Sequence, residues 1–299
     1  GLDVEGVFTH FATADCPETL DFHIQAKRYI EAVEALRHEM GLDRPFFVRY
    51  GEWVLGALRG DFGASYSYSM SVSQMLAGKL PITALLTALA FLLIVVISIP
   101  LGIFTAGHAG GRFDKALTVA NQVLMAVPPF FTGVLLTLIF GLTLRWFTPG
   151  AFVAPEVSFW RSVGYLMFPA VSIALPRIAM TVKMLKGSIL TELERDYVRT
   201  SYSRGNSRRT TLYRHVLRNA VPATVTFLAM TVADIVAGSV VIEQVFAIPG
   251  LGRLLLSSIS GRDYPVVQAV VVILAFWVVL VNLIADLINQ RLDPRLRLS

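Results

Sequence analysis

Five apolar stretches dominate the chain after its first eighty residues, and each is long enough to cross a lipid bilayer as a helix. They cover residues 82–106, 116–144, 163–185, 223–246 and 266–288. About 20 apolar residues span the hydrocarbon core of a membrane when they form a helix. The whole chain is 55% hydrophobic and only 16% charged, whereas soluble domains carry about 25% charged residues. We therefore expect an all-α membrane protein, a polytopic helical bundle with five visible spans.

Prolines mark several of these stretches. Pro81 precedes the first one, where proline suits the first turn of a helix. Pro128 and Pro129 predict a kink in the second, which would free backbone carbonyls beside a transport pathway. Pro169 and Pro176 are expected to interrupt the third.

Residues 1–80 contain no stretch that could cross a membrane, and we expect them to form a separate helical segment before a transmembrane domain at 81–299. The spacing of apolar residues predicts helices at 24–40 and 46–58, followed by a turn-rich connector at 60–65. Seven Lys and Arg face eleven Asp and Glu in this segment. Because cytoplasmic loops carry an excess of cations, this balance predicts an external, periplasmic-side position.

The segment 186–222 between the third and fourth stretches is strongly basic, with Lys186 and seven Arg against three acidic residues. Such a short basic loop belongs on the cytoplasmic side, and alternation of the loops then places residue 299 inside as well. Two short helices are expected here. Gly205 suits a helix stop, and Ser207 suits the cap of a second helix. That helix would carry Leu212, Val216 and Ala220 on one stripe and Arg214 and Arg218 on another.

The basic segment resembles the coupling loop of ABC-importer permeases, specifically the dipeptide/oligopeptide/nickel permease family. In that family a loop with a Glu-Ala-Ala-x-x-x-Gly core docks on an ATPase subunit, and here Arg199-Thr200-Ser201-x-x-x-Gly205 occupies the core. A basic loop attracted to anionic lipid is the alternative. The resemblance implies an ATPase-coupling role for Arg199, Thr200, Ser201, Arg204, Gly205, Arg208 and Arg209.

Further motifs extend the resemblance over about residues 41–297. The external hairpin motif of the family is matched by Glu243, Pro249, Gly250 and Gly252. The connector at 60–65, the stretch Arg262–Gln268 and the terminal Leu292-Asp293-Pro294-Arg295 match it too. The family has six spans, so we expect its first span to be absent here, preceding Gly1. The fold implied is that of a type I ABC-importer permease.

The resemblance also implies the partners. They are a second homologous permease, two ATPase subunits, an extracytoplasmic substrate-binding protein and the bilayer of a bacterial or archaeal cytoplasmic membrane.

The chain has no Gly-x-x-x-x-Gly-Lys-Ser/Thr loop, since its Gly78-Lys79 pair is followed by Leu80. We therefore expect no enzyme activity and no cofactor in this chain, with ATP and Mg²⁺ on the ATPases. The five His are scattered and Cys16 is alone, so no metal site is predicted, and the cations sit at span ends rather than in a nucleic-acid patch.

Two charges, Arg177 and Asp234, fall inside the third and fourth stretches. Charges at that depth are costly and normally face a partner or a wet cavity. One hypothesis is that they line the substrate pathway, together with Pro128 and Pro129, and meet the ends of a zwitterionic peptide. The alternative, which we favour from the sequence, is a mutual structural ion pair.

Three transport functions compete at this stage. The resemblance favours an ATP-driven importer of di- or oligopeptides that works by alternating access. A nickel or metal-chelate importer is the second candidate, because the family shares one scaffold across both substrates. An autonomous channel or secondary transporter is a more distant alternative, and it would leave the basic segment 186–222 unexplained.

Overall fold

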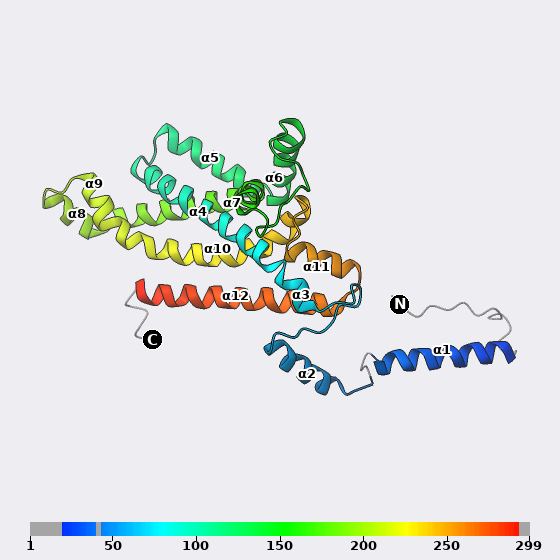
Figure 1. Ribbon diagram of the computed structural model, residues 1–299. Helices are drawn as coiled ribbons and strands as arrows, with labels where there is room; N and C mark the ends of the chain where they lie inside the picture. The colour runs from blue at the N-terminus through cyan, green and yellow to red at the C-terminus, as the bar shows by residue number, and fades with distance from the viewer. Residues whose placement is uncertain (1–19, 40–42, 293–299) are drawn as a thin grey trace. The chain divides into compact units, whose positions relative to one another are not determined.

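The computed structural model describes residues 20–39 and 43–292, and the regular elements in these ranges are helical. Two of them, labelled η, have the wider turns of a π-helix. In chain order they are α1 (Leu20–Glu39), α2 (Phe46–Leu58), α3 (Val72–Ala77), α4 (Leu80–Gly107), α5 (Arg112–Ala126), α6 (Pro129–Leu136), η1 (Thr137–Thr143), α7 (Phe159–Leu193), α8 (Asp196–Ser203), α9 (Arg208–Thr210), η2 (Thr211–Val216), α10 (Leu217–Val245), α11 (Leu251–Ser260) and α12 (Tyr264–Leu292) (Figure 1).

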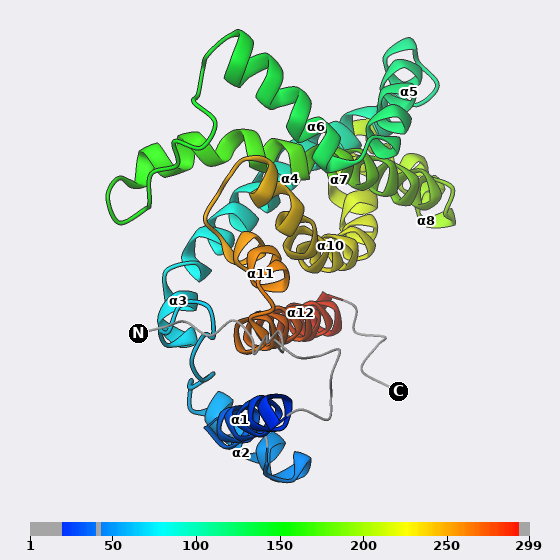
Figure 2. The same cartoon turned by 90° about the vertical axis from the view of Figure 1, so that its right-hand side faces the viewer.

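Within the described residues, four helical segments are long and apolar enough to cross a membrane, and a bent pair supplies a fifth. The all-α fold is therefore confirmed, with four spans, or five if the bent pair counts as one span. The bent pair consists of α5 and the continuous segment of α6 and η1, which meet at 98°. The expected kink lies at Pro128 and Pro129, but it is a sharp corner rather than a gentle bend, as the different directions of α5 and α6 show in Figure 2.

The helices extend further at the basic segment than their apolar stretches predict. α7 continues to Leu193 instead of ending at 185, because Leu185 and Ile189 stay buried in a shared apolar cluster. The second short helix does not stand alone either. A helical segment runs from Arg208 to Val245 and contains the fourth span. Both flanking helices therefore extend into the segment 186–222.

The prolines inside the spans do not end them. α7 contains Pro169 and Pro176 and α10 contains Pro222, yet each is one helix. Spanning helices tolerate proline because neighbouring groups satisfy the freed backbone atoms. The predicted interruption of the third span was therefore wrong, whereas Pro81 does lie in the first turn of α4.

The described chain forms two compact units. One comprises the described residues up to 75 together with 258–269, and the other comprises 76–257 with the described residues from 270. In the larger unit α7 packs on α4 and α10, and α4 also packs on α10. Their shared core is apolar and includes Leu86, Ile94, Leu166, Ile173, Ile235 and Ile242.

In the smaller unit the predicted helix at 46–58 is confirmed as α2, and α1 covers most of the helix predicted at 24–40. The connector at 60–65 and the loop before α12 meet there. Asp263 is fully buried. Its carboxylate accepts hydrogen bonds from Ser65 Oγ at 2.5 Å and from Tyr66 N at 3.2 Å. Two family motifs almost 200 residues apart are thus joined by one carboxylate. Met40 and the tail motif Asp293-Pro294-Arg295 lie outside the described residues.

Candidate functional site

The short helix α8 lies at the centre of the basic segment and has one buried face. Val198 is buried in a cluster with α7 residues and with Ala106 at the end of α4. Leu212, Val216 and Ala220 belong to the same cluster. The predicted apolar stripe is therefore confirmed. α8 thus shares one buried cluster with residues of α4, α7, η2 and α10, and close-packed side chains transmit a displacement to their neighbours.

The turn after α8 is built as the sequence predicts. Gly205 has a φ of +80°, which glycine adopts without steric cost. The Oγ of Ser207 accepts a hydrogen bond from the backbone N–H of Thr210 at 3.2 Å, so Ser207 caps the following helix. Both local predictions are confirmed, and together they fix the angle at which α8 leaves the helical segment that contains α10.

A small polar cluster that the sequence did not reveal holds this turn closed. The buried Ser201 Oγ lies 3.0 Å from Thr211 Oγ1 and accepts a hydrogen bond from Asn206 Nδ2 at 3.1 Å. The Asn206 backbone N–H also donates to the Ser201 carbonyl at 3.2 Å. A small residue is required at position 201 because its side chain points at the neighbouring helix.

The cations of the segment face outward. Arg199, Arg204, Arg208 and Arg209 are exposed, as is Thr200. Arg199 lies 4.0 Å from Asp196, and the Arg209 guanidinium lies 5.9 Å from the Tyr213 ring centroid. Arg208 also has a structural contact, since its Nη2 donates to the Gly107 carbonyl at 2.8 Å. α8 and its flanking turn thus present a basic surface on a rigidly packed base.

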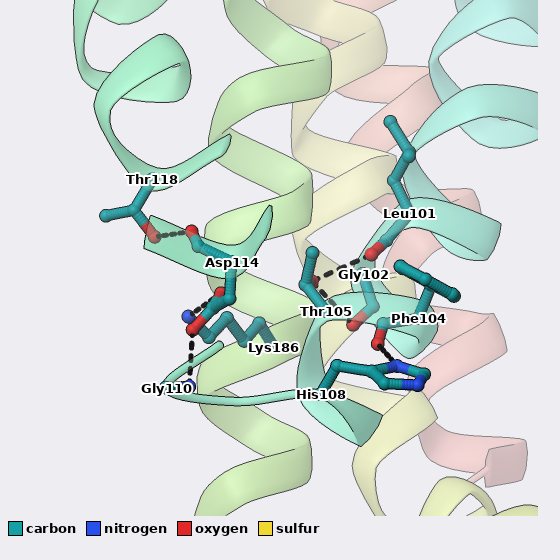
Figure 3. A network of polar contacts seen from close by, with 9 residues as sticks. All are labelled: Leu101, Gly102, Phe104, Thr105, His108, Gly110, Asp114, Thr118 and Lys186. Carbon is teal, nitrogen blue, oxygen red and sulfur yellow. Dashed lines mark hydrogen bonds and ion pairs between the residues drawn. The ribbon is translucent and has the colours of Figure 1, made fainter. Parts of the chain in front are cut away.

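A buried ion pair joins the first turn of α5 to α7 (Figure 3). Asp114 is buried and pairs with Lys186. The carboxylate also accepts the Gly110 N–H at 2.9 Å. Lys186 was predicted to be one of the loop cations, but it lies inside α7 and is held by this pair. The sequence contained no signal for this contact because the two residues are 72 positions apart.

Arg177 and Asp234 form the ion pair that the sequence suggested. Arg177 Nη1 lies 2.9 Å from Asp234 Oδ2, which links α7 to α10. The side chains are not enclosed, with 28% of Arg177 and 54% of Asp234 exposed. Pro128 and Pro129, which were grouped with them, lie at the corner between α5 and α6.

The hairpin motif is organised by Glu243, which is 0% exposed near the C-terminal end of α10. Its carboxylate accepts hydrogen bonds from Gly252 N at 2.7 Å and Arg253 N at 3.1 Å, at the start of α11. Thr83 Oγ1 of α4 donates to the same carboxylate at 2.6 Å and accepts from Leu251 N at 2.9 Å. Glu243 therefore caps α11 and ties it to α10 and α4.

The glycines of the motif are required by space. A Cβ on Gly250 would lie 2.4 Å from the Glu243 carboxylate, and one on Gly252 would lie 2.3 Å from the Val240 Cα. Pro249 lies in a tight turn in which the Gly250 N–H donates to the Ile248 carbonyl at 2.9 Å. The sequence analysis missed α11 and the role of Thr83.

Comparisons with known proteins identify the family. A family model described as "Binding-protein-dependent transport system inner membrane component" matches residues 98–298. The oligopeptide transport system permease protein AppB of Bacillus subtilis is 34% identical over 266 residues, which cover 88% of this chain and 84% of the relative. A Brucella abortus protein named as a peptide transport system permease is 36% identical over 267 residues, which cover 89% and 85%.

The chain belongs to this family of inner membrane components. It is an ABC-importer permease, a transport subunit rather than an enzyme. An inward-facing structure of the MetNI methionine ABC transporter matches the permease with a TM-score of 0.60, covering 74% of this chain and 97% of the other at 18% identity. This likeness confirms the type I importer permease fold.

The positive φ of Gly205 gives a direct prediction for the permease. Gly205→Val is expected to strain the turn by about 1–2 kcal/mol, since a β-branched residue at positive φ is strongly disfavoured. Local opening should rise roughly five- to thirtyfold, seen as faster tryptic cleavage after Arg204. Gly205→Asn should behave like the wild type, because Asn tolerates this conformation. Equal cleavage of the Val and Asn variants would contradict the prediction.

Proposed function

We propose that this permease imports di- or oligopeptides in an ATP-driven ABC transporter. The observation that carries the proposal is the 34–36% identity, over almost nine-tenths of the chain, to relatives named as peptide transport permeases. The substrate passes through the helical bundle, and energy comes from ATP and Mg²⁺ bound by partner subunits. No specific observation favours the nickel alternative.

In this proposal α8 transmits the work of the ATPases. Its exposed basic surface, with Arg199, Thr200, Arg204, Arg208 and Arg209, docks on the ATPase. Its buried face, with Val198 and Ser201, moves α4, α7 and α10. The docking free energy must differ between the ATP-bound and ATP-free states of the ATPase, because a ligand shifts an equilibrium only by its differential affinity. Gly205 preserves the angle of this lever.

The remaining partners complete the transporter. A second homologous permease and two ATPase subunits form the membrane complex, and an extracytoplasmic binding protein delivers the peptide to the side that carries residues 1–80 and the Glu243 hairpin. The basic segment and the C-terminus then face the cytoplasm, in agreement with the distribution of cations. An autonomous channel does not fit membership in a binding-protein-dependent family.

Co-purification from gently solubilised native membranes tests the proposal. The wild-type chain should bring down two ATPase subunits and a second permease, identified by mass spectrometry. The double variant Arg199→Glu/Arg204→Glu should lose the ATPases at least tenfold, because it reverses two exposed charges of the docking surface. Arg161→Glu reverses an exposed charge in the first turn of α7 and serves as the matched control, which should retain all partners.

Two outcomes would overturn parts of the proposal. Recovery of the chain alone or as a homo-oligomer, unchanged by the α8 substitutions, would contradict ATPase coupling. Uptake of labelled nickel but of no labelled peptide by membranes that contain the complete complex would replace the peptide substrate with the metal.

A further inference from the structure

The ion pair of Arg177 and Asp234 lies deep inside two spanning helices but is open on one side. Asp234 precedes the end of α10 at Val245 by 11 residues, or about 17 Å at ~1.5 Å per residue. That places it near the middle of a ~30 Å hydrocarbon core. More than half of its side chain is nevertheless exposed on the surface of the larger unit.

The other interhelical pair of α7 shows what a purely structural contact looks like in the same molecule. Lys186 and Asp114 are only 20% and 8% exposed, and the carboxylate has a second donor in the Gly110 N–H. Among the described contacts, the Asp234 carboxylate pairs with Arg177, and the Arg177 guanidinium otherwise contacts only Met180 Sδ, at 3.9 Å. The pair therefore retains unused hydrogen-bonding capacity on its open side.

An open ion pair at this depth requires a polar neighbour. Contact with lipid tails would leave the exposed carboxylate and guanidinium oxygens and nitrogens without partners, which is strongly disfavoured in hydrocarbon. A water-filled pathway satisfies these groups. Since this chain is an importer permease, the open side of the pair fits the route that substrate takes through the membrane.

The side chains around the pair are adaptable. Met180 lies one turn after Arg177 on α7, and Met230 lies one turn before Asp234 on α10 and is 59% exposed. Methionine is unbranched and polarisable, and it is common at surfaces that accept varied partners. Two fixed opposite charges are thus flanked by two flexible apolar side chains.

We infer that Arg177 and Asp234 form a binding site for the two ends of a zwitterionic peptide. The peptide ammonium binds the Asp234 carboxylate, and the peptide carboxylate binds the Arg177 guanidinium. The variable side chains rest on Met180 and Met230. This inference rests on the proposed peptide import and extends it by naming the part of the substrate that is recognised inside the membrane.

The closed pair is then the empty state of the site. The two ends of an extended dipeptide lie about 7 Å apart at ~3.3–3.6 Å per residue, whereas the charged atoms of the pair are 2.9 Å apart. Binding must separate them and replace one internal ion pair with two external ones. Because two ion pairs with the peptide replace one internal ion pair, neither Arg177 nor Asp234 is left as an unpaired charge when the peptide binds.

Uptake by the complete transporter tests this site. Right-side-out membrane vesicles with the full complex and its binding protein receive a small peptide with free ends, its N-acetylated form or its C-amidated form. In Asp234→Asn the preference of the wild type for the free amine over the N-acetylated form should fall about tenfold, the size expected for one charge-assisted contact. In Arg177→Gln the preference for the free carboxylate over the amide should fall similarly. Both variants keep the same binding protein, so its own selectivity cancels in the comparison.

Two further variants separate recognition from mere structure. Lys186→Gln breaks the other pair of α7 and should lower uptake of all three peptides alike. The double variant Arg177→Gln/Asp234→Asn removes both charges and should recover neither preference. If it restored wild-type uptake and selectivity, or if the single variants left both preferences unchanged, the pair would be structural and the inference would fail. If the wild-type complex took up none of the peptides, the proposed function itself would fail.

Discussion

Glu243→Ala is expected to prevent the permease from accumulating as a folded protein. The substitution leaves the Gly252 and Arg253 N–H groups and the Thr83 hydroxyl without the carboxylate that accepts their hydrogen bonds. Each unpaired buried polar group costs about 1–3 kcal/mol, so the three together cost at least about 3 kcal/mol. Against a typical stability of about 5–15 kcal/mol, such a loss is severe. Protein level in the membrane and the melting temperature in detergent measure it.

The next residue supplies the control for this prediction. Gln244 lies one position further along α10 with an exposed side chain, and Gln244→Ala should leave both measurements unchanged. The melting temperature of Glu243→Gln should lie between those of Glu243→Ala and Gln244→Ala. The amide keeps one acceptor oxygen, but its NH₂ group is a donor and cannot accept from the backbone N–H groups. A Glu243→Ala permease with the melting temperature of the wild type would show that α11 does not depend on its carboxylate cap.

Gly252→Ala is expected to be nearly as damaging, for a steric reason. The added Cβ would lie 2.3 Å from the Val240 Cα and 3.0 Å from its Cβ. A backbone atom cannot rotate away, so α11 must move from α10 and lengthen the hydrogen bond between Gly252 and Glu243. Overpacking of this kind costs about 1–3 kcal/mol, and the weakened cap adds to it. The melting temperature should fall by several degrees.

Gly238→Ala, on the neighbouring helix α10, is the matched control. Nothing lies within 4 Å of a Cβ at Gly238, and alanine is favoured over glycine inside a helix by about 1 kcal/mol. This variant should be as stable as the wild type or slightly more stable. Equal melting temperatures for the two alanine variants would show that α10 and α11 adjust freely to each other.

Local chemistry made part of the molecule predictable. α2 begins at Phe46, after Pro45, and Pro81 lies in the first turn of α4. The positive φ of Gly205 and the cap by Ser207 also followed from residue type alone. These features depend on the conformational limits of Pro and Gly and on the hydrogen-bonding capacity of Ser, which act within a few residues.

The ends of α7 and the start of the helical segment that includes α10 could not be predicted from hydropathy. The apolar stretch ends where a helix leaves the lipid, but the helix continues as long as packing stabilises it. The stabilising packing is one buried cluster that Leu185, Ile189 and Val216 share with Val198 of α8. α11 was missed because its first turn is held by Glu243 and Thr83 rather than by a cap in its own sequence.

The sequence by itself determined that the chain is a helical membrane protein, roughly where its apolar stretches lie and which motifs place it in the importer permease family. These properties belong to individual segments, because hydropathy and turn chemistry are local. Only the tertiary structure decided that Asp114 pairs with Lys186, that Glu243 holds α11 against α4 and that the pair of Arg177 and Asp234 is open. Such contacts depend on how far each helix rotates about its axis and at what angle it crosses its neighbours. Packing among distant segments sets both quantities.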